Sequence, residues 1–306
     1  MGSSLATNQV FIYRLTLVRV GQTTARGVCS VLEDQVARTR YVFDPRVAFR
    51  DLLAGARQPA LWIAFATDEI QQRYRRSKLG LAWIIISYVI FVATISLFFG
   101  NFSDLGHAHF TVYVAINFAI FMFLMGNITD GCAVFRVSKS WIKSAPLPHS
   151  IYVFKSIARS LFVFGINLAV ALMILYIFGF QLHFLALLAI PALVVLLINA
   201  VLVQTTFGYI AARYPDVDHL MQSLMRILYF TTPVLWVRDE HTAPGLRTTI
   251  SELNPFTHAL EIFSAPILGK MPDPKSWLII GVLTLVMLVT TLVVTGFSHR
   301  RLPYWV

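Results

Sequence analysis

The sequence of 306 residues is poor in charge and in cysteine. Only 13% of the residues are charged and 57% are hydrophobic, whereas a soluble globular domain has about a quarter charged and about half apolar residues. Two cysteines, Cys29 and Cys132, are too few for a disulfide scaffold. No apolar run follows the mixed, arginine-rich start, which argues against a cleaved secretory signal. These shortages favour an integral membrane protein whose N-terminus stays in the cytoplasm.

The sequence also lacks the motifs of a self-sufficient enzyme. It contains no Gly-rich phosphate-binding loop of the Walker type, so no ATP site is expected on this chain. Acids are absent from the interiors of its long apolar runs, apart from Asp130 at an edge, and no buried catalytic pair of carboxylates can be assembled. His107 and His109 form a close pair without a nearby third ligand, so we expect an external loop and no metal. No cofactor is therefore predicted for the chain itself.

Long apolar runs are the main positive feature of the sequence, because each run of roughly 20 residues can cross a membrane. They predict an all-α integral membrane fold with six transmembrane helices. The stretch after Arg159 is uncharged as far as Ala212 and fits two crossings, whereas the fifth run is interrupted by Arg226. The expected spans are residues 79–100, 110–129, 160–178, 184–211, 219–237 and 277–297, in a transmembrane domain of residues 79–299.

The basic residues predict which side of the membrane the termini occupy. Six spans place both termini on one side. A connection predicted on that side contains Arg136, Lys139 and Lys143, and the tail of residues 300–306 is basic as well. The two short connections on the other side have no Lys or Arg. By the positive-inside rule, both termini are cytoplasmic.

Three segments are predicted to be neither spans nor plain loops. After an unassigned cytoplasmic extension of residues 1–58, residues 59–78 form an interfacial amphipathic helix, or merely a basic flank that orients the first span. Residues 134–145 form a short cytoplasmic helix that either docks in a partner's cleft or rests on headgroups. Residues 238–270 contain short helical pieces, which predict a re-entrant external gate or an external loop packed on the bundle.

A few side chains inside the spans are candidates for contact with a substrate. Four of them are aromatic: Trp83, Tyr88, Phe91 and Tyr229. Their rings could let sugar rings slide past, or could belong to the aromatic belts that face lipid. Arg226 is costly in a membrane unless it is paired, wetted or close enough to the surface to snorkel. We expect that it could meet an anionic group of a substrate.

Four ordered stretches of the sequence resemble one family of membrane proteins. They are residues 73–83 (RYRRSKLGLAW), residues 146–153, residues 212–217 leading to 230–236 (FTTPVLW), and residues 254–262 (NPFTHALEI) followed by 265–269. In this order, within about residues 59–297, they resemble the type 2 ABC transporter permeases that export O-antigen and other cell-surface polysaccharides.

The resemblance implies a homodimeric permease served by two separate ABC nucleotide-binding subunits, which would bind ATP and Mg. The substrate would be undecaprenyl-diphosphate-linked O-antigen or a related polysaccharide, exported across the bacterial inner membrane. Membrane lipids are further partners, and nucleic acid is not. The alternatives are a type 2 permease for a lipid, a teichoic-acid-like polymer or a small drug, and a membrane transferase acting on a polyprenyl-linked glycan, which would need the buried acids that this chain lacks.

The resemblance also implies roles for individual residues, none of them catalytic. Contact with the ATPase would involve the helix before the first span and the short cytoplasmic helix, through Arg73, Arg75, Arg76, Arg136, Lys139, Trp141, Ile142 and Lys143. The external gate would include Asn254, Pro255, Phe256, Glu261 and Pro266.

Overall fold

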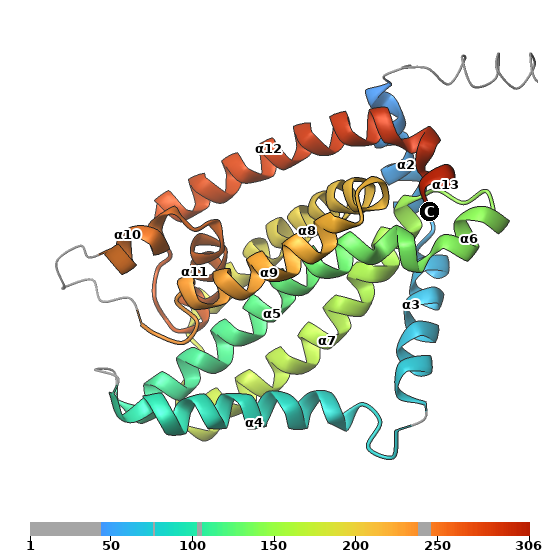
Figure 1. Ribbon diagram of the computed structural model, residues 1–306. Coiled ribbons are helices and arrows are strands. Elements are labelled where there is room, and N and C mark those ends of the chain that lie inside the picture. Colours follow the sequence, from blue (N-terminus) through green and yellow to red (C-terminus); the bar gives the residue numbers. More distant parts are fainter. Residues whose placement is uncertain (1–43, 76, 103–105, 238–245) are drawn as a thin grey trace, which may run out of the picture. The chain divides into compact units, whose positions relative to one another are not determined.

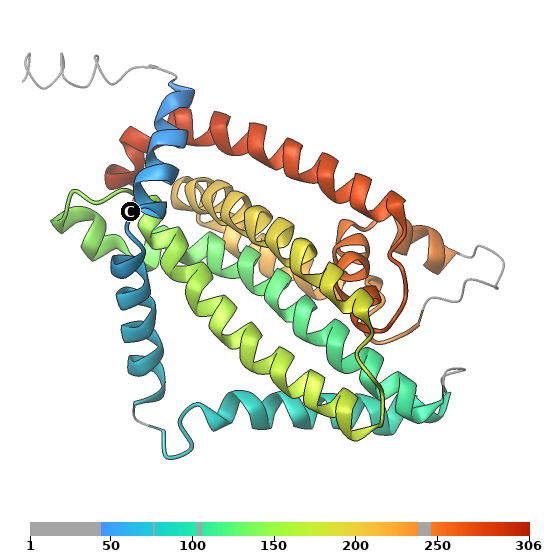
Figure 2. The ribbon, with the colours of Figure 1, turned by 180° about the vertical axis from the view of Figure 1, so that it is seen from behind.

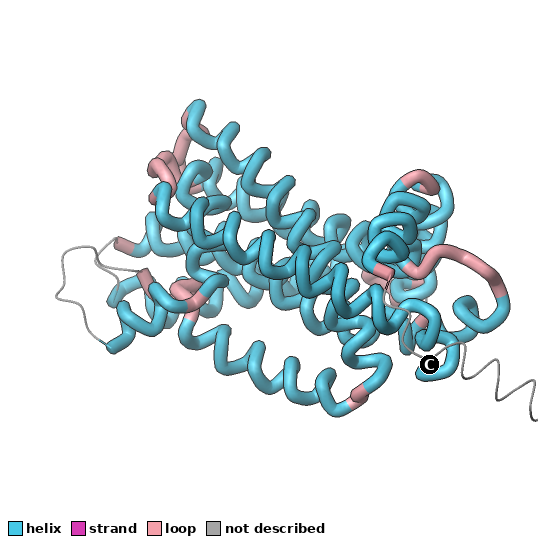
Figure 3. Tube along the Cα trace, turned by 90° about the horizontal axis from the view of Figure 1, so that it is seen from above, coloured by secondary structure: helices cyan, strands magenta, loops and turns pink. Residues whose placement is uncertain are grey.

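A computed structural model describes residues 44–75, 77–102, 106–237 and 246–306. The described residues do not include residues 1–43 of the predicted extension, Arg76, or residues 238–245 of the predicted external gate. The described part of the chain contains helices and no strand (Figures 1 and 3). In order, the α-helices are α2 (Pro45–Ala56), α3 (Pro59–Tyr74), α4 (Ala82–Phe99), α5 (His107–Val137), α6 (Lys139–Ser144), α7 (Ser150–Ile177), α8 (Ala189–Arg213), α9 (Asp216–Thr231), α10 (Leu246–Leu253), α11 (Pro255–Ile267), α12 (Pro274–Ser298) and α13 (Leu302–Trp305).

Helix α5 forms the centre of the bundle. It packs against α4, α7, α8, α9 and α11, and α7 and α8 lie beside it in both side views (Figures 1 and 2). Of its most apolar stretch, 67% is buried, against 17–33% for the other long apolar helices. A helix that is apolar on all sides is expected to be enclosed by protein or lipid, and α5 is enclosed mainly by its own chain.

Among the described residues, five segments are long and apolar enough to cross a membrane: α4, α5, α7, residues 184–213 and residues 274–305. The predicted fifth span of residues 219–237 differs from the structure, because α9 ends at Thr231 and has 16 residues. Pro233 disfavours a helical conformation at the residue before it, and Thr232 is extended. At about 1.5 Å per residue α9 is roughly 24 Å long, so the sixth crossing stays a prediction.

Other parts of the fold also differ from the prediction. The expected cytoplasmic helix of residues 134–145 is divided at Ser138: its first turn is the end of α5, and α6 has only six residues. Helix α2 lies within the extension that had no predicted structure. It packs on α7 and α12 through Ala48 and Gly55, whereas Arg46 and Arg50 are exposed.

Three helices begin with the same local arrangement, a capping residue followed by proline. The side chains of Asp44, Asn254 and Asp273 each accept a hydrogen bond from the backbone N–H two residues later, at the starts of α2, α11 and α12. Such side chains satisfy N–H groups that have no partner inside the helix, and proline suits the first helical position because its missing N–H is not needed there. The Asn254-Pro255 pair within the predicted external gate therefore starts a helix.

Candidate functional site

Aromatic rings from four helices form a cluster beside α5. Phe91 of α4 stacks on Phe118 of α5 with ring centres 3.8 Å apart, and lies 6.5 Å from Tyr229 of α9. Phe121 of α5 is 5.4 Å from Tyr229 and 6.0 Å from Phe256 of α11. Together with Tyr88, which stacks on Phe118, these residues are called the aromatic cluster. It joins three of the predicted substrate-contacting residues to one residue of the predicted gate.

The members of the predicted substrate path differ in exposure. Tyr88 is only 4% exposed, and its hydroxyl donates a hydrogen bond to the carbonyl oxygen of Ala115 in α5. Phe91 and Tyr229 are half-buried. Trp83 is 54% exposed at the start of α4, and no ring contact joins it to the cluster in the described part of the chain. Of the predicted path residues that belong to the aromatic cluster, therefore, Phe91 and Tyr229 keep solvent-accessible surface in a single subunit, whereas Tyr88 is buried.

Helix α9 presents an exposed face that carries Arg226. Asp218 and Met225 are its buried residues, whereas Leu220, Leu224 and Ile227 are exposed large apolar residues at helical spacing. Arg226 is exposed and has no ion pair or hydrogen bond to any residue that the structure describes. This face is therefore left to contact lipid, a second protein chain or a substrate.

The predicted gate residues lie on α11 or at its start, and several bind the neighbouring elements. The Asn254 amide donates to Thr232 Oγ1 just after α9, at 2.8 Å. Glu261 Oε2 accepts from Ser276 Oγ at 2.9 Å, and Glu261 Oε1 accepts from the backbone N–H of Asp273 at 3.2 Å. Of the other gate residues, Pro255 is the first residue of α11, Phe256 belongs to the aromatic cluster, and Pro266 is buried near the end of α11. These bonds hold α11 between the end of α9 and the start of α12.

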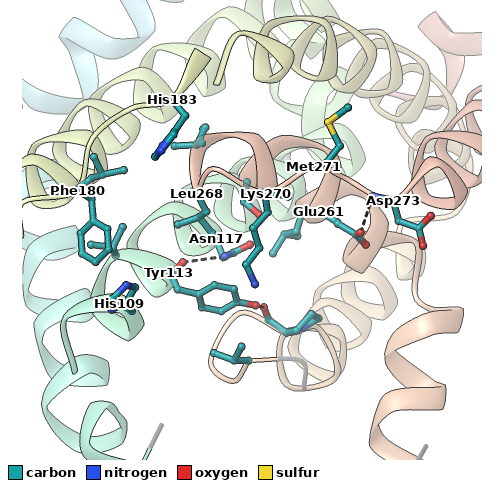
Figure 4. Close-up of a pocket in the computed structure, with 18 of the residues that line it drawn as sticks. His109, Tyr113, Asn117, Phe180, His183, Glu261, Leu268, Lys270, Met271 and Asp273 are labelled. Atoms are coloured by element: carbon teal, nitrogen blue, oxygen red, sulfur yellow. Dashed lines mark hydrogen bonds between the residues drawn. The ribbon is translucent and has the colours of Figure 1, made fainter. Parts of the chain in front are cut away.

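A pocket of about 500 Å³ lies against α11 at the same end of the bundle. It is lined by Tyr113 and Asn117 of α5 together with Glu261 of α11 and Lys270 (Figure 4). The Tyr113 hydroxyl donates to the carbonyl oxygen of Pro233 at 2.6 Å. Amide, imidazole and charged groups beside apolar walls suit a molecule that carries several hydroxyl groups.

The opposite end of the bundle carries α6 and the C-terminus (Figures 1 and 2). The ring of Trp141 in α6 lies 5.2 Å from that of Phe65 in α3, and Trp141 remains about half exposed. Lys139 and Lys143 are exposed, whereas Ile142 is buried. Ile142 thus fastens α6 to the bundle, and the other three predicted contact residues of α6 (Lys139, Trp141 and Lys143) are exposed and available to a partner.

The remaining predicted coupling residues do not gather at α6. Arg136 at the end of α5 forms an ion pair with Asp218 of α9. Arg73 and Arg75 are exposed at the far end of α3, eight and ten residues after Phe65, or about 12–15 Å along a helix. The predicted coupling set is therefore divided between an α6 surface, an ion pair between α5 and α9, and a separate surface at the end of α3.

An ion network that the sequence analysis did not predict ties α3 to the central helices. Glu69 of α3 pairs with Lys155 at 2.9 Å and with Arg159, both on α7, and Arg159 also pairs with Asp130 of α5 at 2.7 Å. Burial opposes ionisation of Glu69, but the hydrogen bond to Lys155 and the charges of Arg159 and Lys155 prevail, so the pKa of the Glu69 carboxyl is lowered. The partners are separated by tens of residues, and no local pattern connects them.

Potential metal ligands come together away from the predicted histidine pair. His107 lies 3.3 Å from Ser96 Oγ, whereas the ring of His109 packs edge-on against Phe180, so the two histidines contact different groups. A group of three potential ligands, Asp51, His149 and His299, lies near the other end of the bundle. These residues come from α2, the start of α7 and the end of α12.

The long apolar helices define a multi-pass helical membrane protein. The chain belongs to the ABC-2 type transporter family, whose model matches residues 60–268. It is similar to the O-antigen export system permease protein RfbA of Myxococcus xanthus, with 21% identity over 238 residues that cover 74% of this chain and 88% of that protein. Permeases of this family work with separate ABC ATPase subunits, so ATP hydrolysis takes place outside this chain.

Proposed function

We propose that this chain is the membrane subunit of an ATP-driven exporter of undecaprenyl-diphosphate-linked O-antigen or a related surface polysaccharide. The similarity to an O-antigen export permease over most of that protein's length carries the proposal. The aromatic cluster agrees with it, because aromatic faces pack against sugar rings without requiring one sequence of sugars. The pocket lined by amide and charged groups beside α11 suits the hydroxyl groups of a glycan.

The permease would work as a homodimer in the inner membrane, with both termini in the cytoplasm. Its exposed α9 face supports the dimer, because Leu220, Leu224 and Ile227 form an apolar stripe that the described part of the chain leaves exposed. Arg226 lies on the same helix. A second copy could bring two such arginines together around an anionic substrate, where the diphosphate would offset the cost of placing cations in a membrane.

Coupling to the ATPase would use two surfaces of each permease subunit. Trp141, Lys139 and Lys143 of α6 form the first, and Arg73 and Arg75 form the second. The ion network of Glu69 connects α3 to α7 and α5, so a displacement of α3 by the ATPase would be transmitted to the central helix. The α10–α11 segment, at the other end of the bundle, would then open or close the exit.

Co-purification with an ABC ATPase, followed by ATPase measurements in lipid, tests the proposed substrate. Lipid-linked glycan should stimulate hydrolysis, and the complex should move the glycan into the vesicle lumen. Stimulation by a small drug or by a phospholipid, without any response to glycan, would point to another substrate class. Transfer of sugar by the permease alone would contradict the proposal altogether.

Two matched pairs of variants test the proposed residues in that complex. Trp141→Asp should uncouple substrate from ATP hydrolysis, whereas Trp141→Phe keeps a ring against Phe65 and should remain coupled. Arg226→Ala should impair export of the lipid-linked glycan without loss of complex assembly, and Arg226→Lys should retain part of the export. Full export by Arg226→Ala would exclude a role for this charge.

A further inference from the structure

The group of Asp51, His149 and His299 joins three distant parts of the chain. Asp51 lies on α2, His149 immediately precedes α7, and His299 immediately follows α12. One ligand atom from each of these side chains lies within 4.8 Å of those of the other two. Two imidazoles and one carboxylate form a ligand set typical of zinc and neighbouring transition metals.

The spacing of these groups is close to that of ligands around one ion. His299 Nε2 and Asp51 Oδ1 are 3.2 Å apart, and tetrahedral ligands with bonds of about 2.1 Å lie about 3.4 Å apart. The ring centres of His149 and His299 are 4.3 Å apart. Two imidazoles bound tetrahedrally to one ion through such bonds have ring centres about 5.3 Å apart, so the two rings would have to move apart by about 1 Å. Small side-chain movements would therefore suffice to complete the site.

Neighbouring groups already orient two of the three ligands. His149 Nδ1 lies 3.0 Å from the hydroxyl of Tyr209 in α8, which leaves Nε2 of the same ring for an ion. The carboxylate of Asp51 accepts hydrogen bonds from the backbone N–H groups of His149 and Ser150, at 2.9 and 2.8 Å. Metal-binding histidines and carboxylates generally have such partners, which fix the orientation of the ligand.

The site combines a sheltered interior with access from solution. The side chain of Asp51 is 9% exposed and that of His299 is 26% exposed. An ion could enter past His299 and would then be held among side chains that are largely removed from water. We propose that Asp51, His149 and His299 bind one divalent transition-metal ion of the zinc type, which fastens α2 to the end of α12.

Metal titration of the full chain in detergent tests the site. The protein should carry an affinity tag other than polyhistidine and be stripped with EDTA before titration with Zn²⁺, and Co²⁺ should serve as a spectroscopic probe. We expect one ion per chain, a rise in melting temperature with Zn²⁺, and visible absorption bands from Co²⁺ bound to nitrogen and oxygen ligands. The absence of stoichiometric binding would overturn the proposal.

Variants separate a bound ion from the existing hydrogen bonds. In His299→Gln the amide can still donate to Asp51, but the imidazole ligand is lost, so binding should weaken by about 100-fold or more while the metal-free protein stays folded. Tyr209→Phe removes the group that orients His149 and should weaken binding by about 10–100-fold. His219→Gln changes an exposed histidine of α9 and should have no effect. Equal Zn²⁺ affinity in the His299 and His219 variants would refute the assignment.

Discussion

The contact between α5 and α8 predicts a strong effect of one added methyl group. At Gly131 of α5, a β-carbon would lie 2.9 Å from Cα of Gln204 in α8, whereas ordinary contacts are 3.4–4 Å. Because the neighbouring atom belongs to the backbone, it cannot rotate away. The Gly131→Ala substitution therefore requires the two helices to separate locally by about 0.5 Å.

The magnitude follows from two opposing terms. Forcing an extra carbon into a packed interface costs about 1–3 kcal/mol, and separation would also strain the hydrogen bond from Gln204 to Asn127, which is 2.7 Å long. Alanine is favoured over glycine inside a helix by up to about 1 kcal/mol. We expect a net loss of about 1–2 kcal/mol in the free energy of unfolding.

A matched control lies on the same helix. A β-carbon at Gly126 would have no neighbouring atom within 4 Å in the described part of the chain, so Gly126→Ala keeps the gain in helix propensity without the collision. Thermal or denaturant unfolding in the same detergent should place Gly131→Ala below the wild type and Gly126→Ala at or slightly above it. Equal stability of the two variants would refute the inferred close approach of α5 and α8.

Two further predictions concern polar contacts. Glu69→Gln should lower the free energy of unfolding at pH 7 by about 1–3 kcal/mol, because it removes the carboxylate that pairs with Lys155 and leaves Arg159 with Asp130 alone. Exposed Asp68→Asn should not. The folded-state pKa of Glu69 is lowered, so its stabilisation is complete above its ordinary pKa of 4.5 and disappears as the pH falls through the folded value. Denaturation curves of wild type and Glu69→Gln should therefore converge on acidification, and a gap that persists at low pH would count against this ion pair. Asn254→Ala should cost about 1–2 kcal/mol and accelerate amide hydrogen exchange at the start of α11, whereas Asp44→Ala removes a similar cap at α2 and should leave α11 exchange unchanged.

Long apolar runs predicted most of the membrane helices because their length and composition are local properties of the sequence. Their ends were harder to predict. Helix α5 extends to Val137, beyond the expected residue 129, and its last turns contain Asp130 and Arg136. Both charges are paired with side chains of other helices, Arg159 and Asp218. Pairing over such distances in the sequence leaves no periodic signal.

In the candidate site too, the residue types could be predicted from the local sequence, whereas their contacts with distant parts of the chain could not. Aromatic residues of the predicted substrate path could be named from their place in an apolar run. However, α4 is apolar on all sides, so periodicity could not distinguish buried Tyr88 from exposed Trp83. Likewise, the basic character of residues 134–145 predicted a cytoplasmic helix without revealing that Arg136 is engaged with Asp218. The group of Asp51, His149 and His299 required the fold itself.

The burial of α5 has a consequence for biosynthesis. The Asn127 side chain donates to Phe123 of its own helix at 2.7 Å, but its Oδ1 accepts from Gln204, which is synthesised 77 residues later. Until α8 emerges from the ribosome, that oxygen lacks its eventual donor, and a polar atom is unfavourable in hydrocarbon. Inserted α5 therefore carries an unsatisfied hydrogen-bond acceptor until α8 is made. Gln204 of α8 can satisfy it only when α8 packs against α5, which would favour the correct pairing of these two helices.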